Sequence, residues 1–151
     1  MFKESDIVLS AKHIVKQFPA SGGRTLTACN DVNLNVYKGK TLGIVGESGC
    51  GKSTFVRMVI SLDKPTSALD VTTQAQIVRQ MMELRDDFGT GIIIVTHNIG
   101  VAAYMADQLV VMQHGKVVDQ GTRDEVMNHP TSDYTKKLLA AVPEMEGQRY
   151  V

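Results

Sequence analysis

The sequence predicts an α/β layered fold with a mostly parallel sheet, preceded by an antiparallel β segment and followed by C-terminal helices. Two short apolar runs, TLGIV (Thr41–Val45) and IIIVT (Ile92–Thr96), alternate with segments of helical periodicity. A glycine loop, GESGCGKST (Gly46–Thr54), joins the first run to a helix. A length of 151 residues is enough for one domain with a core. We therefore expect a single domain over residues 1–143 and a flexible tail over 144–151.

The composition excludes several classes of protein. Sixteen basic and sixteen acidic residues give a net charge near zero, which argues against nucleic acid as the main partner. No apolar run is long enough for a membrane span, and the N-terminus lacks the apolar core of a secretory signal, so a cytoplasmic location is expected. The two cysteines, Cys29 and Cys50, fit reduced thiols better than a disulfide framework.

The N-terminal third accounts for the antiparallel β segment. Residues 7–45 are rich in β-branched residues, and VNLNV (Val32–Val36) alternates apolar and polar side chains as a half-buried strand does. Turn signals stand at Ser21–Gly23 and Lys38–Lys40. TLGIV then ends at the glycine loop and suits a buried strand.

Helical spacing follows the glycine loop. Three apolar residues at i, i+4 and i+7 mark one face of a helix that stops before Pro65: Phe55, Val59 and Leu62. Asp70 can cap a second helix, which ends at Gly89. The charged residues of Glu83–Asp87 are predicted to form a solvated end of that helix.

The C-terminal half supplies the remaining elements. IIIVT is a continuous β-branched run, typical of a strand covered on both faces. The elements after it are a short helix at Asn98–Ala106, a hairpin at residues 108–121 that turns at His114–Lys116, a capping box at Thr122–Glu125 and a last helix at Ser132–Val142. Strands alternating with helices in this way indicate a mostly parallel sheet.

The glycine loop matches the pattern G-x-x-x-x-G-K-[ST], with a strand before it and a helix after it. Its glycines let successive N–H groups point inward at phosphate oxygens, and the helix N-terminus favours the same anion. Lys52 can reach the β- and γ-phosphates, Ser53 can ligate Mg²⁺ and Thr54 can point at the α-phosphate. The expected phosphate-binding residues are Gly46, Glu47, Ser48, Gly49, Cys50, Gly51, Lys52, Ser53 and Thr54.

The sequence resembles the nucleotide-binding subunit of an ABC transporter in three phrases, which occur in this order: GESGCGKST, PTSALDV and IIIVTHNIGV. The ending HPTSDYTKKLLAAVP resembles the oligopeptide, dipeptide and glutathione importer group, and the resemblance runs from about Ile7 to Pro143. It implies a truncated P-loop NTPase core that binds ATP and Mg²⁺. It further implies that Phe18 stacks on adenine, that His97 is the switch histidine at the γ-phosphate, and that Ser67–Asp70 is the D-loop.

The same resemblance implies partners and a location. Subunits of this kind dock on membrane permease subunits, pair with a second nucleotide-binding subunit, and lie on the inner face of the cell membrane without spanning it. Asp70 therefore has two readings, as a helix N-cap and as a D-loop contact that matters only in such a dimer. His13, His114 and His129 have no metal-ligand spacing, and we expect no role for them.

The sequence departs from the family pattern between the first helix and the D-loop. The Q-loop glutamine, the helical subdomain, the LSGGQ signature and the apolar strand ending in Asp-Glu have no counterpart. SLDKPTSALDV (Ser61–Val71) looks like two family phrases joined at a shared PTS, which indicates an in-frame internal deletion near residues 65–67. Lys64 is then the ordinary lysine of the first phrase. A rival reading makes Asp63 a metal ligand on a rebuilt strand, but the helix after Lys52 would then be barely longer than one turn.

The departures leave three functional hypotheses. The first is the energy-coupling subunit of a peptide importer, and the second is a non-hydrolytic nucleotide-binding remnant or a pseudogene-like fragment. The third, a small-molecule kinase, leaves the D-loop and switch-histidine phrases unexplained. Because the glutamate base and the signature are missing, we expect negligible ATP hydrolysis. In the family core, the strand before the glycine loop lies beside the strand before the switch histidine, so the resemblance also implies that TLGIV and IIIVT still pair, with a newly exposed sheet edge along IIIVT.

Overall fold

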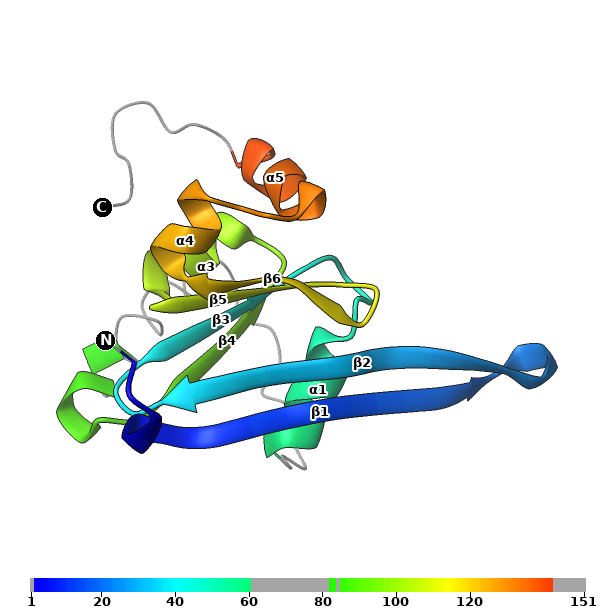
Figure 1. Cartoon of the computed structure of the whole chain (residues 1–151), viewed down its shortest axis with the longest axis horizontal. Helices are drawn as coiled ribbons and strands as arrows, with labels where there is room; N and C mark the ends of the chain where they lie inside the picture. Colours follow the sequence, from blue (N-terminus) through cyan, green and yellow to red (C-terminus); the bar gives the residue numbers. More distant parts are fainter. Residues whose placement is uncertain (1, 61–81, 84, 143–151) are drawn as a thin grey trace.

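The fold was taken from a computed structural model, which describes residues 2–60, 82–83 and 85–142 (Figure 1). The strands are β1 (Ile7–Ala20), β2 (Arg24–Tyr37), β3 (Thr41–Val45), β4 (Ile92–Thr96), β5 (Gln108–Gln113) and β6 (Lys116–Thr122). The helices are α1 (Lys52–Ile60), α3 (Ile99–Met105), α4 (Arg123–Asn128) and α5 (Asp133–Ala140), with short 3₁₀ turns at Glu4–Asp6 and Ser21–Gly23. The predicted α/β class and the predicted order of these elements are confirmed.

The central sheet has the strand order β4-β3-β5-β6. β3 pairs in parallel with both β4 and β5, and β6 runs antiparallel to β5. The register of β3 on β4 runs from Thr41 opposite Ile92 to Val45 opposite Thr96, so the two apolar runs pair as predicted. β1 and β2 form a separate long antiparallel hairpin, whose tip extends beyond the rest of the molecule (Figure 1).

Two apolar cores lie on opposite faces of the sheet. The hairpin and α1 cover one face, where Phe55 of α1 is fully buried beside residues of β2, β3 and β5. The other face carries α3, α4 and α5, as Figure 1 shows. The burial of Phe55 agrees with its predicted helical spacing, while the side chains of Val59 and Leu62 lie outside the described residues.

The prediction that β4 is covered on both faces is wrong. Its residues are half-buried or exposed, and the Val95 side chain is 37% exposed. Within the described part of the sheet, β4 is the edge strand and pairs only with β3. β-branched composition alone does not distinguish a central strand from an edge strand, because both have residues suited to a pleated surface. The exposed edge expected along this run is therefore present in the described part of the chain.

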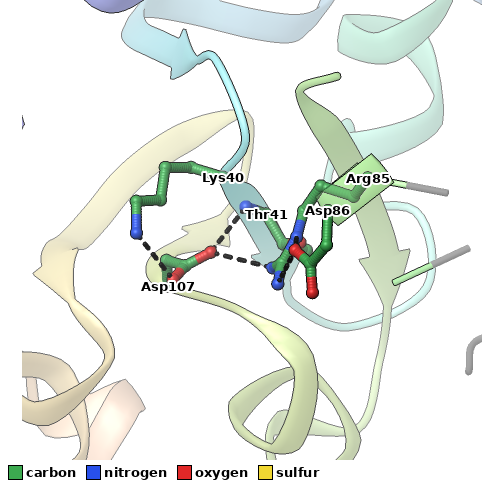
Figure 2. Close-up of polar contacts among 5 residues, drawn as sticks. All are labelled: Lys40, Thr41, Arg85, Asp86 and Asp107. Carbon is green, nitrogen blue, oxygen red and sulfur yellow. Dashed lines mark hydrogen bonds and ion pairs between the residues drawn. The ribbon is translucent and has the colours of Figure 1, made fainter. Parts of the chain in front are cut away.

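The prediction of a solvated helix end at Glu83–Asp87 holds for Glu83, Asp86 and Asp87, which are exposed, and is wrong for Arg85, which is only 13% exposed. Its guanidinium donates to the Thr41 hydroxyl at 3.0 Å and pairs with the Asp107 carboxylate at 3.2 Å (Figure 2). Asp107 also accepts the Thr41 backbone N–H at 2.8 Å and lies 3.5 Å from the Lys40 ammonium. This cluster ties three separate segments together at the start of β3.

Several local predictions can be compared directly with the structure. Residues 82–83 and 85–88 are helical and Gly89 follows with φ near +62°, so the predicted helix end is confirmed. The β5–β6 turn is at His114-Gly115, and Lys116 already belongs to β6. Thr122 and Glu125 form the predicted capping box. The start of the second helix, with Asp70, lies outside the described residues, as does all of SLDKPTSALDV with Asp63 and Lys64.

Asp119 on β6 holds the start of α5. Its carboxylate accepts the backbone N–H groups of Thr131 and Ser132 at 3.0 Å each and the Thr131 hydroxyl at 2.8 Å. Burial alone raises the pKa of Asp119, but the hydrogen bonds from Ser132 and Thr131 outweigh burial and hold the pKa below its ordinary value. The ionised carboxylate therefore stabilises the packing of α5 on the sheet.

Asp119→Asn should lower the free energy of unfolding at pH 7 by roughly 1–3 kcal/mol, since charge-assisted hydrogen bonds are lost. A group whose folded pKa is depressed contributes stability above its unfolded pKa, and this contribution is lost as the pH falls through the folded pKa. The difference between the two proteins should therefore shrink below about pH 4. Urea titrations at pH 7 and at about pH 3.5 measure it; a difference that is equal at both values contradicts the assignment.

Candidate functional site

A cavity of about 550 Å³ lies where the β1–β2 hairpin, the glycine loop, the end of β4 and the β5–β6 turn meet. Its walls come from four stretches of the chain that are far apart in sequence. The lining residues are Phe18, Leu26, Thr27, Ala28, Ser48, Gly49, Gly51, Lys52, Ser53, Thr54, Val95, Thr96, His97, His114 and Gly115. The fold therefore gathers an aromatic ring, a lysine, hydroxyl groups and two histidines around one space.

Most of the predicted binding residues meet in this cavity. Those that line it are Phe18, Ser48, Gly49, Gly51, Lys52, Ser53, Thr54 and His97. Gly46, Glu47 and Cys50 belong to the glycine loop but do not line the cavity, and Asp70 lies outside the described residues. Leu26, Thr27 and Ala28 of β2, together with the turn His114-Gly115, are lining residues that sequence patterns did not identify.

The glycine loop turns sharply into α1. Gly49 and Gly51 have φ values of +82° and +101°, which favour glycine. The first helical hydrogen bond is donated by the Phe55 N–H to the Gly51 carbonyl at 2.9 Å. The N–H groups of Lys52, Ser53 and Thr54 come before it and have no acceptor within the helix. They lie at the cavity wall, where the positive end of α1 favours an anion.

Backbone contacts from two other elements hold the loop in this shape. A Cβ at Gly51 would collide with the Ala28 carbonyl oxygen of β2. The Gly115 N–H donates to the Cys50 carbonyl at 2.9 Å, and the Asn30 N–H donates to the Gly115 carbonyl at 2.8 Å. The loop, the hairpin and the β5–β6 turn are thus joined through main-chain atoms.

Lys52 spans the loop from inside. Its buried ammonium donates to the Gly46 and Glu47 carbonyls at 2.6 Å each and lies 3.4 Å from the Cys50 sulfur. Two loop carbonyls therefore hold the charge of Lys52 beside the cavity. Cys50 is a buried free thiol, as is Cys29, and burial raises the pKa of the Cys29 thiol. The expected reduced state of both cysteines agrees with this.

Tyr134 of α5 supports the start of the loop. Its hydroxyl oxygen accepts the Glu47 backbone N–H at 2.9 Å, across 87 positions of sequence. Burial and the neighbouring charge of Glu47 raise the pKa of the Tyr134 hydroxyl, although the Glu47 N–H bond opposes this. A tyrosine this far along the chain carries no local pattern that connects it to the loop, so only the folded structure identifies it.

Phe18 of β1 and His97, which follows β4, line the cavity from two elements other than the glycine loop. Phe18 is 40% exposed, stands opposite Leu26 in the hairpin and has the Lys16 ammonium 5.3 Å from its ring centre. His97 follows β4, where the Asn98 N–H donates to the Thr96 hydroxyl at 3.1 Å and the Asn98 side chain caps α3. These bonds fix the backbone on which His97 stands.

Metal-binding capacity within the described ranges is limited. No group of three or more His, Cys, Asp or Glu side chains is placed to hold a metal ion in the described part of the chain. Ser53 is exposed to the cavity and offers one hydroxyl oxygen. A hard cation such as Mg²⁺ accepts this kind of ligand when phosphate oxygens and water complete its shell. The donor set therefore fits Mg²⁺ that arrives with a phosphate ligand.

Comparison with known proteins assigns the family. The sequence profile of the ABC transporter family matches residues 29–146. The chain belongs to the ABC transporter family. OppD, the oligopeptide transport ATP-binding protein of Haemophilus influenzae, is 45% identical to this ABC chain over 85 residues, which are 56% of the chain and 26% of OppD. GsiA, the glutathione import ATP-binding protein of Escherichia coli K12, is 44% identical over 91 residues, which are 60% of the chain and 15% of GsiA.

The ABC chain thus spans about a quarter or less of the length of these two relatives. Solved structures confirm the fold. The dimeric cassette MJ0796 of a bacterial ABC transporter gives a TM-score of 0.67 at 16% identity, covering 77% of this chain and 99% of that one. An ATP binding subunit of an ABC transporter gives 0.67 at 14% identity, covering 87% and 98%. No helix in the described ranges is long and apolar enough to cross a membrane.

Proposed function

We propose that this ABC chain binds ATP with Mg²⁺ in the cavity, as the nucleotide-binding part of a peptide-importer system. One observation carries the proposal: the cavity joins the N-terminus of α1 and Lys52 at one end to the exposed ring of Phe18 at the other. A ligand that carries both an anionic group and an aromatic base matches these two ends. The relatives named as oligopeptide transport and glutathione import ATP-binding proteins support the same ligand and the peptide-importer class.

The phosphates belong at the glycine loop. The N–H groups of Gly49 and of residues 51–54 can donate to phosphate oxygens, and the Lys52 ammonium can exchange its two carbonyl acceptors for the β- and γ-phosphates. Gly46, Glu47 and Cys50 contribute by shaping the loop. Thr54 is half-buried in the cavity wall and is assigned to the α-phosphate.

The base belongs at the hairpin. Phe18 offers a ring face whose stacking on a purine contributes roughly 1–3 kcal/mol in comparable sites. His97, at the end of β4, is assigned to the γ-phosphate side, because it enters the cavity beside Thr96, next to the strand that leads into the glycine loop. Asp70 is assigned to the dimer contact by resemblance alone.

Mg²⁺ would be held by Ser53 together with phosphate oxygens and water. When bound, the ion neutralises charge on the β- and γ-phosphates. Among the described lining residues there is no carboxylate that could orient an attacking water. We infer that this chain binds ATP and turns it over very slowly, and that an internal deletion near residues 65–67 removed the hydrolytic half of the site.

The peptide-importer class also implies partners for the transport system to which this chain is related. We propose permease subunits, a second nucleotide-binding subunit and a position on the inner face of the membrane. The alternative is a nucleotide-binding remnant that no longer couples to transport. The sequence contains no LSGGQ signature to complete a partner's site, and this favours the remnant. Co-sedimentation with membranes that carry the permeases distinguishes the two: release into the soluble fraction supports the remnant.

A thermal melt with millimolar Mg-ATP tests the binding proposal. A ligand that binds only the native state raises stability by RT ln(1 + [L]/Kd), so ATP at about 100 times Kd adds roughly 2.7 kcal/mol. Phe18→Ala should reduce the shift given by ATP and leave the shift given by inorganic tripolyphosphate unchanged, because only ATP carries a base. Val15→Ala, on an exposed valine of the same strand, is the matched control. Equal shifts for Phe18→Ala and the parent would reject the stacking assignment.

Turnover of ATP is expected to be negligible. Loss of a general base alone costs typically 10²–10⁴-fold in rate. Phosphate release should therefore remain below about one per minute, which is far below the usual range for ATP-using enzymes. A rate near one per second that disappears in Lys52→Ala would show that the site retains its hydrolytic machinery.

A further inference from the structure

We propose that His114, at the tip of the β5–β6 hairpin, binds the ribose of the nucleotide. This inference rests on the proposed function, because it uses the direction in which ATP lies in the cavity. His114 is an exposed residue that lines the cavity from an element unrelated to the glycine loop. In the sequence, neither the spacing of His114 from the other histidines nor its place in a turn indicates a function.

The backbone fixes the position of His114. The two turn residues, His114 and Gly115, have φ values of +50° and +77°, which is the geometry of a tight two-residue hairpin turn. Gly115 is bonded on one side to the Cys50 carbonyl at 2.9 Å and on the other to the Asn30 N–H at 2.8 Å. The turn is therefore held at its tip by the glycine loop and by β2 at once.

The same contacts place the turn between the two ends of the ligand site. A Cβ on Gly115 would lie 2.8 Å from the Ala28 carbonyl oxygen and 3.1 Å from that of Thr27, and a Cβ on Gly51 would lie 3.5 Å from the Gly115 Cα. Along β2, Thr27 and Ala28 follow Leu26, which pairs with Phe18. The turn thus lies beside the part of the wall that leads from the base end to the phosphate end.

The chemistry of this middle section suits a sugar. A nucleotide that stacks on Phe18 and places its phosphates at Gly51 and Lys52 has its ribose between them, next to Thr27, Ala28 and the turn. Of these, His114 has the longest polar side chain, and a neutral imidazole can donate to or accept from a ribose hydroxyl. Asn-Gly is the usual sequence for this kind of turn, so histidine at the first position is not required by the turn itself.

The test measures equilibrium binding of ATP, 2′,3′-dideoxyATP and inorganic tripolyphosphate, each with Mg²⁺, to the parent protein and to His114→Asn. Asparagine suits a positive φ, so this variant keeps the turn and removes the imidazole. His129→Asn is the matched control, since His129 is an exposed histidine outside the cavity wall. His114→Gly is a second variant that the same backbone accepts, and the melting temperature of each protein without ligand checks its folding.

We expect His114→Asn to weaken ATP binding roughly 3- to 10-fold, as for one hydrogen bond, while tripolyphosphate binding stays unchanged. The parent should prefer ATP over dideoxyATP by a similar factor, and the variant should lose that preference. Unchanged ATP affinity overturns the proposal. An equal loss for ATP and tripolyphosphate also overturns it, because the imidazole would then act on phosphates. A parent that binds none of the three ligands rejects the proposed function itself, and this outcome is distinct from the other two.

Discussion

Lys52→Ala is expected to abolish the thermal stabilisation that Mg-ATP gives and to weaken ATP binding by at least about 30-fold. A hydrogen bond to a charged group contributes about 1.5–3 kcal/mol, and the Lys52 ammonium has three N–H donors to offer the phosphates. Isothermal titration with Mg-ATP measures the loss. Lys136→Ala is the control, because this exposed lysine pairs only with Asp133 within α5 in the described structure.

The loss must be separated from damage to the loop itself, since Lys52 also donates to the Gly46 and Glu47 carbonyls. AMP distinguishes the two causes, because it lacks the β- and γ-phosphates but shares the base, the sugar and the α-phosphate. If Lys52 acts on the phosphates, Lys52→Ala weakens ATP much more than AMP. If the two ligands are weakened alike, the variant has changed the shape of the loop, and the assignment of Lys52 to the β- and γ-phosphates is rejected.

Asp107→Ala is expected to lower the free energy of unfolding by roughly 2–4 kcal/mol. The carboxylate accepts the Thr41 N–H at 2.8 Å and pairs with Arg85, and its removal leaves these donors without their acceptor in a partly buried site. Urea denaturation followed by circular dichroism measures the change. Asp124→Ala is the matched control, since Asp124 is 74% exposed and pairs only with its neighbour Arg123 in the described structure, against 28% exposure for Asp107.

A double-mutant cycle with Arg85→Ala extends this test. If the pair at 3.2 Å carries much of the effect, the two changes together should cost at least 1 kcal/mol less than the sum of the single changes. Asp124→Ala should change stability by less than about 0.5 kcal/mol. An Asp107→Ala variant as stable as this control would mean that the cluster in Figure 2 contributes nothing measurable.

Local patterns predicted most of the fold. The turn at Ser21–Gly23 and the capping box at Thr122 are confirmed, because each depends on residues close in sequence. The pairing of the two apolar runs is confirmed as well, but it was expected from the family resemblance and not from a local pattern. The exposure of β4 was predicted only in part. A run of β-branched residues indicates a strand, but the elements that cover it decide how deeply it is buried.

Tertiary contacts explain what the sequence did not reveal about the site. The glycine loop is a contiguous motif and was recognised from its spacing alone. Tyr134 reaches the glycine loop across 87 positions of sequence, and His114 lies about 60 positions after the glycine loop with which it lines the cavity. The residues next to Tyr134 and His114 in the sequence form no phosphate-binding pattern. Arg85 was expected in solvent because charged residues surround it in sequence, whereas its acceptor, Asp107, belongs to a different segment.

The distribution of the cavity wall along the chain has an evolutionary consequence. In the described part of the chain, the lining residues fall within two blocks, residues 18–54 and 95–115, whose backbones are fastened to one another by β3–β4 pairing and by the contacts around Gly115. None of these fastenings runs through the connection between α1 and β4. The two described blocks can therefore keep their arrangement when that connection is lengthened or shortened, so that ligand binding and any activity encoded in the connection can be gained or lost separately.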